Sequence, residues 1–154
     1  MEERDHSRNV AAKAREHFLS EGFNCAESVL LANMESAGAE GGWFPRLASG
    51  FGGGIARTGQ VCGAITGALM AIGWARGRDA ADQPKDDIYN LGEALVRDFT
   101  SEFGTTSCKM LIDVELRDPE EYKKAKKNGV FERQCAAFVE FCALRAAEIL
   151  SEER

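Results

Sequence analysis

The sequence lacks any long apolar run. No stretch of about 20 apolar residues, the length that a membrane-spanning helix needs, occurs in the chain. The charged N-terminal segment MEERDHSRNV is not followed by an apolar segment either, so no secretory signal is expected. The 154 residues suffice to bury a core in one domain. We therefore expect a cytoplasmic protein without membrane insertion, folded as a single domain over residues 1–154.

The sequence also has fewer basic than acidic residues. The chain has 19 Lys and Arg against 25 Asp and Glu, a net charge of −6. Nucleic-acid binding depends on a surplus of basic side chains facing phosphate, so no nucleic-acid partner is expected. The one basic cluster, YKKAKKNG, follows two glutamates and is typical of a solvated helix face.

The two-residue alternation that is typical of β-strands does not occur. Apolar residues instead recur every three or four positions, and glycines stand where several of these patterns end. The expected helices cover approximately residues 9–22, 24–38, 58–76, 86–103 and 132–152. The sequence thus predicts an all-α, single-domain bundle of about five main helices.

Motifs of hydrolases and nucleotide-binding proteins are missing as well. The only two histidines, His6 and His17, have no acidic residue that we expect to orient them, and both are typical of surface positions. No G-x-S-x-G motif occurs, and FGGGIARTGQ departs from both common phosphate-binding glycine patterns.

Cysteine, in contrast, is well represented, although no C-x-x-C pair occurs. The absence of that motif argues against a thioredoxin-type pair, a zinc ribbon and a haem c attachment site. In a reducing compartment, five unpaired cysteines are expected to be reactive, metal-binding or buried.

Four of the five cysteines lie near predicted helix starts. Asn24 and Glu27 form a plausible capping box, and three helix-capping residues, TTS, precede another of these cysteines. Free N–H groups at a helix start favour a thiolate, so we expect lowered pKa values. The four residues are Cys25, Cys62, Cys108 and Cys135. Each one alone could also be an ordinary buried residue.

The fifth cysteine, Cys142, has a different setting. It lies two helical turns beyond Cys135, which places the two residues roughly 10 Å apart along a helix, too far for a disulfide. Phe138, Phe141 and Ile149 share its predicted face. We interpret Cys142 as a small core residue.

Glycines surround Cys62 on both sides. We expect Gly52, Gly53 and Gly54 to bring backbone N–H groups against a sulfur site, and Arg57 to stabilise a thiolate or an anionic cluster. On the following helix, Gly63, Gly67 and Ala71 stand four residues apart, a pattern that lets helices approach closely.

Four segments of the chain carry a family resemblance. They are GFNCAESVLLA, ASGFGGGIARTGQVCGAITGALMAIG, SCKMLI and GVFERQC. In this order, and nearly end to end, they resemble the bacterial and archaeal C_GCAxxG_C_C family of redox-active proteins. The family's four cysteines match Cys25, Cys62, Cys108 and Cys135, and its CGAxxG form matches CGAITG. Cys142 has no counterpart in the family pattern.

The resemblance implies an electron-transfer or redox protein in which these four cysteines bind an iron–sulfur cluster or, alternatively, zinc. Gly52, Gly53, Gly54, Arg57 and Gly63 would line that cofactor. Haem c is not expected, because C-x-x-C-H is missing. A redox partner protein and a homodimer are further expectations.

Two other functions stay open. One is a cofactor-free thiol–disulfide oxidoreductase, in which Cys62 and Cys25 are the leading redox thiols and Cys108 is another partner for Cys62. The other is a helical binding module whose thiols are buried and structural.

Overall fold

The computed structural model describes residues 2–152. Within that range the chain forms helices and no strand, which confirms the all-α prediction. No described helix combines the length and the apolar character that crossing a membrane requires. In chain order the elements are α1 (Glu2–Leu19), α2 (Cys25–Ser36), α3 (Phe44–Ala48), the short 3-10 helix η1 (Ser49–Phe51), α4 (Gly63–Arg76), α5 (Asp86–Phe103), α6 (Cys108–Ile112), α7 (Pro119–Lys127), the π-helical segment η2 (Phe131–Cys135) and α8 (Ala136–Ser151).

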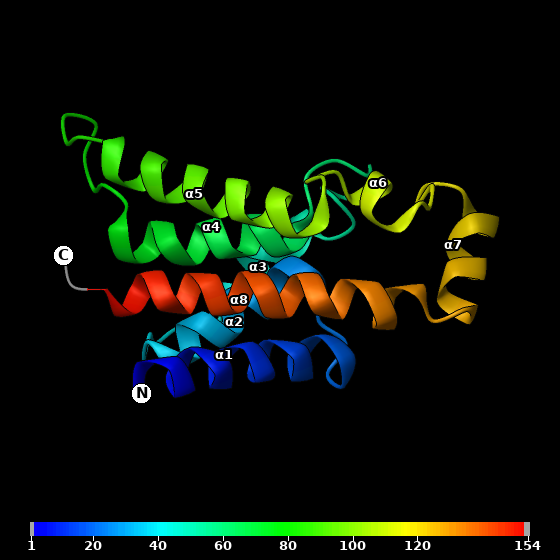
Figure 1. Cartoon of the computed structure of the whole chain (residues 1–154), viewed down its shortest axis with the longest axis horizontal. Helices are drawn as coiled ribbons and strands as arrows, with labels where there is room; N and C mark the ends of the chain where they lie inside the picture. Colours follow the sequence, from blue (N-terminus) through cyan, green and yellow to red (C-terminus); the bar gives the residue numbers. More distant parts are fainter. Residues whose placement is uncertain (1, 153–154) are drawn as a thin grey trace.

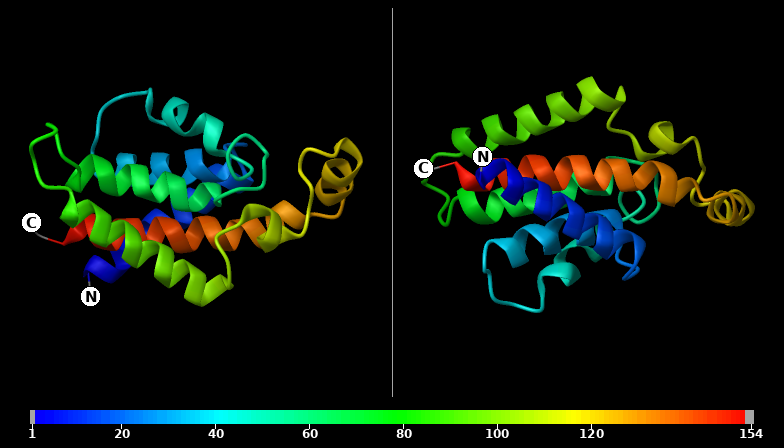
Figure 2. Two further views of the ribbon diagram at one scale, coloured as in Figure 1. Left: turned by 90° about the horizontal axis from the view of Figure 1, so that it is seen from above. Right: turned by 60° about the horizontal axis from the view of Figure 1, so that its bottom comes forward.

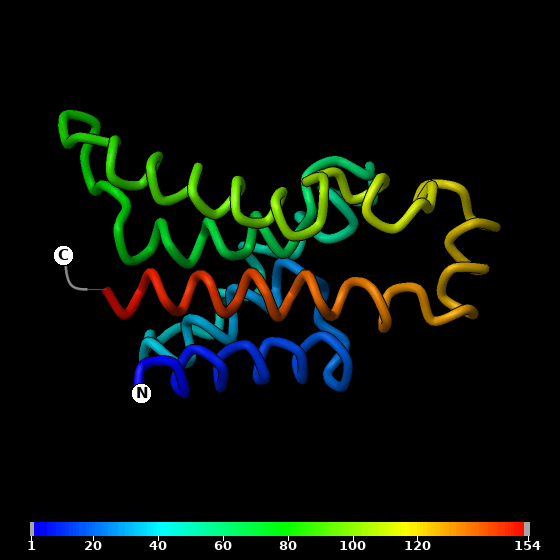
Figure 3. The backbone as a smooth tube through the Cα atoms, in the orientation of Figure 1, coloured from blue at the N-terminus to red at the C-terminus, as the bar shows by residue number. Residues whose placement is uncertain are grey.

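The long helices form a bundle around α8 (Figure 1). Helices α1 and α2 pack on one side of α8, and α4 and α5 pack on the other. Helices α2, α4 and α8 all begin at the same end of the bundle. Beyond that end the chain leaves through α6, passes through α7, which stands away from the other helices, and returns into α8 (Figures 2 and 3).

Small side chains allow α2 and α4 to pack closely. Gly67 lies in the middle of α4, and a Cβ atom added to it would lie only 2.4 Å from the carbonyl oxygen of Ala26 in α2. Ala64, Ala68 and Ala71 on the same helix are completely buried. The row of small residues therefore has the packing role that the sequence indicated.

Two helix boundaries match their sequence signals. The side chain of Asn24 accepts a hydrogen bond from the Glu27 N–H at 2.9 Å, and the Glu27 carboxylate accepts one from the Asn24 N–H at 2.8 Å. This confirms the capping box before α2. Helix α5 ends at Gly104, whose φ of 88° gives the left-handed cap that glycine favours.

Two other boundaries differ from the prediction. Helix α4 begins at Gly63 rather than near Thr58, because the preceding residues adopt a left-handed turn. The last helix becomes a regular α-helix only at Ala136, after the π-helical segment η2.

The expectation for His17 was wrong. His17 is only 2% exposed, and its two ring nitrogens lie 2.9 Å from carboxylate oxygens of Glu21 and Glu35. Glu21 follows His17 by one helical turn, a spacing that the sequence displays and that could have identified the contact. Glu35 belongs to α2, so this buried histidine joins the first two helices.

Candidate functional site

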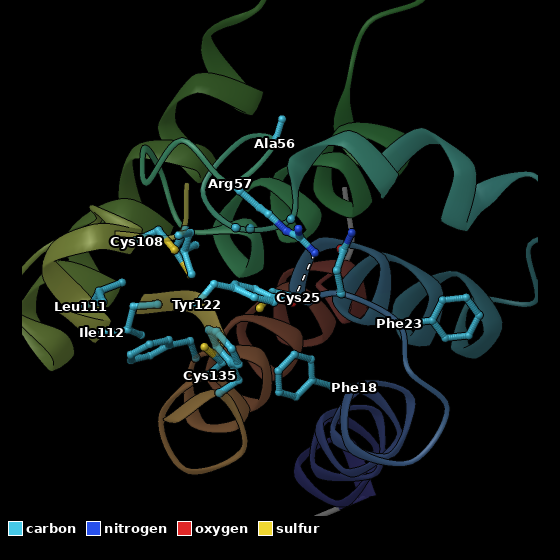
Figure 4. Close-up of a pocket in the computed structure, with 18 of the residues that line it drawn as sticks. Phe18, Phe23, Cys25, Ala56, Arg57, Cys108, Leu111, Ile112, Tyr122 and Cys135 are labelled. Atoms are coloured by element: carbon cyan, nitrogen blue, oxygen red, sulfur yellow. Dashed lines mark hydrogen bonds between the residues drawn. The ribbon is translucent and has the colours of Figure 1, made fainter. Parts of the chain in front are cut away.

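The structure brings four cysteines to one cavity of about 600 Å³, at the end of the bundle where α2, α4 and α8 begin. Cys25, Cys108 and Cys135 lie around the same space in Figure 4, and Cys62 also lines it. Cys25 is partly exposed, whereas the other three are buried. The remaining wall is largely aromatic and apolar, and includes Phe18, Phe23, Leu111, Ile112, Phe131 and Phe138.

Cys25 owes its position to the capping box and to a neighbouring glycine. As the first residue of α2, it directly follows Asn24, whose side-chain amide donates to the carbonyl oxygen of Ser49 at 3.1 Å. A Cβ atom added to Gly63 would lie 3.3 Å from Cβ of Cys25 and 2.9 Å from the carbonyl oxygen of Phe51. Gly63 thus allows the starts of α2 and α4 to come together.

Cys62 and Cys108 are held side by side by backbone hydrogen bonds. The Cys62 N–H donates to Thr106 at 2.8 Å, and the Cys108 N–H donates to Gln60 at 2.7 Å. These bonds flank an isolated antiparallel bridge between Val61 and Ser107. The bridge fixes the relative position of the two cysteines.

The glycine loop before Cys62 is a left-handed turn. Residues 53–57 have φ values between 50° and 66°, although only Gly53 and Gly54 among them are glycines. A residue with a Cβ atom pays roughly 1–2 kcal/mol in this conformation, so the turn contains strain at Ile55, Ala56 and Arg57. Hydrogen bonds within residues 50–60 hold it closed.

The loop glycines serve close approach of side chains. A Cβ atom on Gly54 would lie 2.5 Å from Cβ of Cys108, and one on Gly52 would lie 2.7 Å from the side-chain nitrogen of Asn24. We expected the loop N–H groups to face sulfur. The N–H groups of residues 55–57 donate to carbonyl oxygens of residues 50–52. The orientation of the Gly52, Gly53 and Gly54 N–H groups toward sulfur stays a prediction.

Cys135 ends the π-helical segment η2 and is 6% exposed. Because helical structure already precedes it, Cys135 does not lie at a free helix start as the sequence suggested. A π-helical turn contains one more residue per hydrogen-bonded loop than an α-helical turn and is frequent at functional sites. No local sequence signal announced this segment.

Burial dominates the acidity of the thiols. It raises the pKa of Cys62 well above the ordinary value, while the N–H groups of Ala64 and Ile65 at the start of α4 oppose this only weakly. Burial, with a smaller contribution from Cys25, raises the pKa of Cys108 to about 11. The expected lowering of these two pKa values was therefore wrong.

Cys135 has the largest effect on the pKa of Cys25. A hydrogen bond between the two thiols is the main reason why the pKa of Cys25 lies well above its ordinary value, and burial adds to it. Cys142 is completely buried and does not line the cavity. Burial is also the main cause of its raised pKa, with smaller contributions from Cys62 and Cys25.

Arg57 faces the cavity but contacts a tyrosine. Its guanidinium donates to the hydroxyl of Tyr122 at 3.2 Å and lies 4.4 Å from the centroid of the same ring (Figure 4). It does not stand one helical turn before Cys62, because residues 53–57 are not α-helical. Tyr122, from α7, is a site residue that the sequence did not indicate, since it appeared only as part of a solvated basic helix.

The four thiols of the cavity differ in how well they fit the two kinds of metal centre that the sequence suggested. Among residues 2–152, no group of three or more His, Cys, Asp or Glu side chains has an arrangement that could hold a metal ion. A single zinc ion, with all ligands within about 2.3 Å, does not fit this arrangement. A larger metal–sulfur cluster separates its thiolate ligands, and four thiols around one cavity match its donor set.

Comparison with known proteins gives one match. The family model described as "Putative redox-active protein (C_GCAxxG_C_C)" matches residues 23–149, a range that includes all five cysteines. Neither a curated protein nor a solved structure matches the chain.

Proposed function

Because the chain belongs to the C_GCAxxG_C_C family of redox-active proteins, we propose that its redox chemistry takes place at the cavity lined by Cys25, Cys62, Cys108 and Cys135. The observation that carries this proposal is that these four cysteines, which are far apart in the sequence, line one cavity, and Cys135 is the main influence on the pKa of Cys25 there. A disulfide requires that the Cα atoms of the two cysteines lie within about 7 Å of each other, so we propose Cys25 and Cys135 as the pair that forms one.

In the proposed reaction, Cys25 and Cys135 cycle between dithiol and disulfide. Cys25 is the less buried residue of the two, and in this scheme it meets the substrate disulfide first. Its deprotonated sulfur attacks one substrate sulfur, and the other substrate sulfur leaves as a thiol after taking up a proton. Cys135 then attacks Cys25 and releases the second thiol. Two electrons and two protons pass from the protein to the substrate.

This pairing differs from the one that the sequence suggested, in which Cys62 reacts with Cys25 or Cys108. Cys62 is 3% exposed and capped by the bridge to the segment before Cys108. We assign Cys62 and Cys108 to the inner wall of the cavity. There their thiols would undergo thiol–disulfide exchange with the Cys25–Cys135 disulfide.

A second candidate function is electron transfer through an iron–sulfur cluster. The observation that favours it is that four thiols from four separate parts of the chain line one cavity. Cys25, Cys62, Cys108 and Cys135 would hold the cluster, and the cluster would supply one-electron transfer. Arg57 would add positive charge beside an anionic centre, and Gly52, Gly53 and Gly63 line the same cavity. Gly54 does not line it and instead allows Cys108 to approach the loop.

One experiment separates the candidates. Protein is purified without oxygen and analysed for iron, sulfide, zinc and visible absorbance, and a second sample is oxidised, alkylated and mapped by mass spectrometry. A Cys25–Cys135 disulfide that is lost in Cys25→Ser and kept in Cys142→Ala supports dithiol chemistry. Stoichiometric iron and sulfide with brown colour support the cluster. If neither is found, both proposals fail and the helical module with structural thiols is the better explanation.

A further inference from the structure

The cysteine cavity continues into a shallow groove on the surface. Arg57, Ala56, Leu116 and Tyr122 line both spaces, and Arg117 joins them in the groove. The groove therefore adjoins the cavity that Cys25 lines. A ligand could occupy both at once, with one end at the thiols and the other beside the arginines.

The two arginines of this groove form no ion pair with the described residues. Of the ion pairs within residues 2–152, none involves Arg57 or Arg117, although acidic residues outnumber basic ones in the chain. Glu115 pairs with Lys109 at 2.8 Å, and this pair is the main cause of the lowered pKa of Glu115. Arg117 makes a smaller contribution to that lowering. The groove thus presents positive charge to an incoming ligand.

Arg57 is positioned for an anion. The left-handed turn fixes its backbone, and the ring of Tyr122 supports its guanidinium. A guanidinium has five N–H donors, and within residues 2–152 Arg57 makes one side-chain hydrogen bond, to the Tyr122 hydroxyl. The free N–H groups match the two oxygens of a carboxylate, and less entropy is lost on binding because the side chain is already held.

We infer that the site takes a low-molecular-weight disulfide that carries a carboxylate. This inference rests on the proposed dithiol function. The carboxylate binds Arg57 at the groove, the aliphatic part lies against the aromatic wall, and the disulfide reaches Cys25. The cavity volume of about 600 Å³ is in the range of small-molecule sites, which favours such a ligand over a protein loop.

The overall reaction is balanced by the substrate itself. The substrate disulfide is the oxidant: its S–S bond breaks, and a Cys25–Cys135 bond forms. Two substrate thiols leave with the two protons and two electrons that the cysteines lose. Arg57 does not take part in bond changes and acts as a binding residue.

The test compares three probe disulfides of different charge: dithiodipropionate, which is anionic, bis(hydroxyethyl) disulfide, which is neutral, and cystamine, which is cationic. The rate of Cys25–Cys135 disulfide formation in the fully reduced chain is measured with each probe by quenching and mass spectrometry. Each rate is divided by the rate of the same probe with mercaptoethanol, which removes differences in intrinsic reactivity. The expected order is anionic, then neutral, then cationic.

Arg57→Gln should lower the ratio of the anionic to the neutral rate by about tenfold, since a charge-assisted hydrogen bond is lost. Arg57→Lys should recover part of that ratio. Lys123→Gln is the matched control, because Lys123 is an exposed cation on the helix of Tyr122 and lines neither space. This control should keep the ratio of the unmodified protein.

Two results would overturn the inference and leave the proposed function standing. One is an unchanged ratio in Arg57→Gln while the Cys25–Cys135 disulfide still forms. The other is a disulfide that forms only with an oxidised partner protein and with none of the three probes. If no oxidant of either kind gives that disulfide, the proposed dithiol function itself has failed.

Discussion

At the scale of single residues, the cysteines are subject to two opposing influences. The helix start favours a thiolate by about 0.3–1 kcal/mol, which is less than one pKa unit. Burial of a charged group can change a pKa by up to about 3–5 units in the opposite direction. The second influence is larger at Cys62, which caps α4 and is 3% exposed. Burial therefore keeps the Cys62 thiol protonated near neutral pH.

The pKa of about 11 at Cys108 predicts slow alkylation near neutral pH. Relative to a thiol with the ordinary value of 9.0, the reactive thiolate is about 100-fold less abundant. Because the shift is upward, the labelling rate should keep rising about tenfold per pH unit beyond pH 9 and level off near pH 11. Iodoacetamide labelling at several pH values, with peptide mapping, measures this profile.

The same peptide from urea-unfolded protein is the control for Cys108. There the rate should level off near pH 9, since burial is lost. A native profile that already levels off at or below pH 9 would show that burial does not control this thiol.

At the scale of elements, the contact between α2 and α4 depends on Gly67. In Gly67→Ala the new Cβ atom would meet the backbone of Ala26 at 2.4 Å, and backbone cannot move aside as a flexible side chain can. We expect a loss of about 1–3 kcal/mol in the free energy of unfolding, measured by urea denaturation.

Gly73 provides a matched comparison on the same helix. A Cβ atom there would meet nothing within 4 Å, so Gly73→Ala should stabilise the protein by about 0.5–1 kcal/mol through helix propensity alone. Equal effects of the two substitutions would refute the close contact at Gly67.

The left-handed turn is the second element whose conformation should measurably lower the free energy of unfolding. Ala56 has a φ of 50° and an exposed side chain, so Ala56→Gly removes strain without removing buried contacts. The relief exceeds the entropy cost of glycine, and we expect a gain of up to about 1 kcal/mol in unfolding free energy. Urea denaturation of Ala56→Gly alongside Ala12→Gly measures the difference.

Ala12 is exposed within α1, where the same substitution should cost about 0.5–1 kcal/mol. The two alanine-to-glycine substitutions are therefore expected to have opposite signs. A destabilisation by Ala56→Gly as large as that by Ala12→Gly would mean that the turn stores no strain at this position.

At the scale of the whole molecule, local signals in the sequence were sufficient for the main helices. The spacing of apolar residues and Gly104 defined α5, and Asn24 with Glu27 defined the start of α2. The start of helix α7 also has a recognisable capping signal in the sequence. Asp118 caps it and Pro119 is its first residue, a combination typical of helix starts.

The details of the site could not be predicted, because distant parts of the chain create them. The bridge from Val61 needs Ser107, and the left-handed conformation of Ile55 and Arg57 contradicts the local preference of both residues. The π-helical turn before Cys135 has no known local signature. Motif spacing could identify the cysteines of the site, but burial, which determines their acidity, depends on the complete fold.

The proposed disulfide between Cys25 and Cys135 would also couple oxidation to folding. A bond between them would close a loop of about 110 residues and would remove roughly 5 kcal/mol of chain entropy from the unfolded state. Thermodynamic linkage makes this effect reciprocal: the folded bundle holds each thiol at a high effective concentration for the other, and unfolding dilutes them. The reduction potential of the Cys25–Cys135 pair would therefore depend on the stability of the folded bundle.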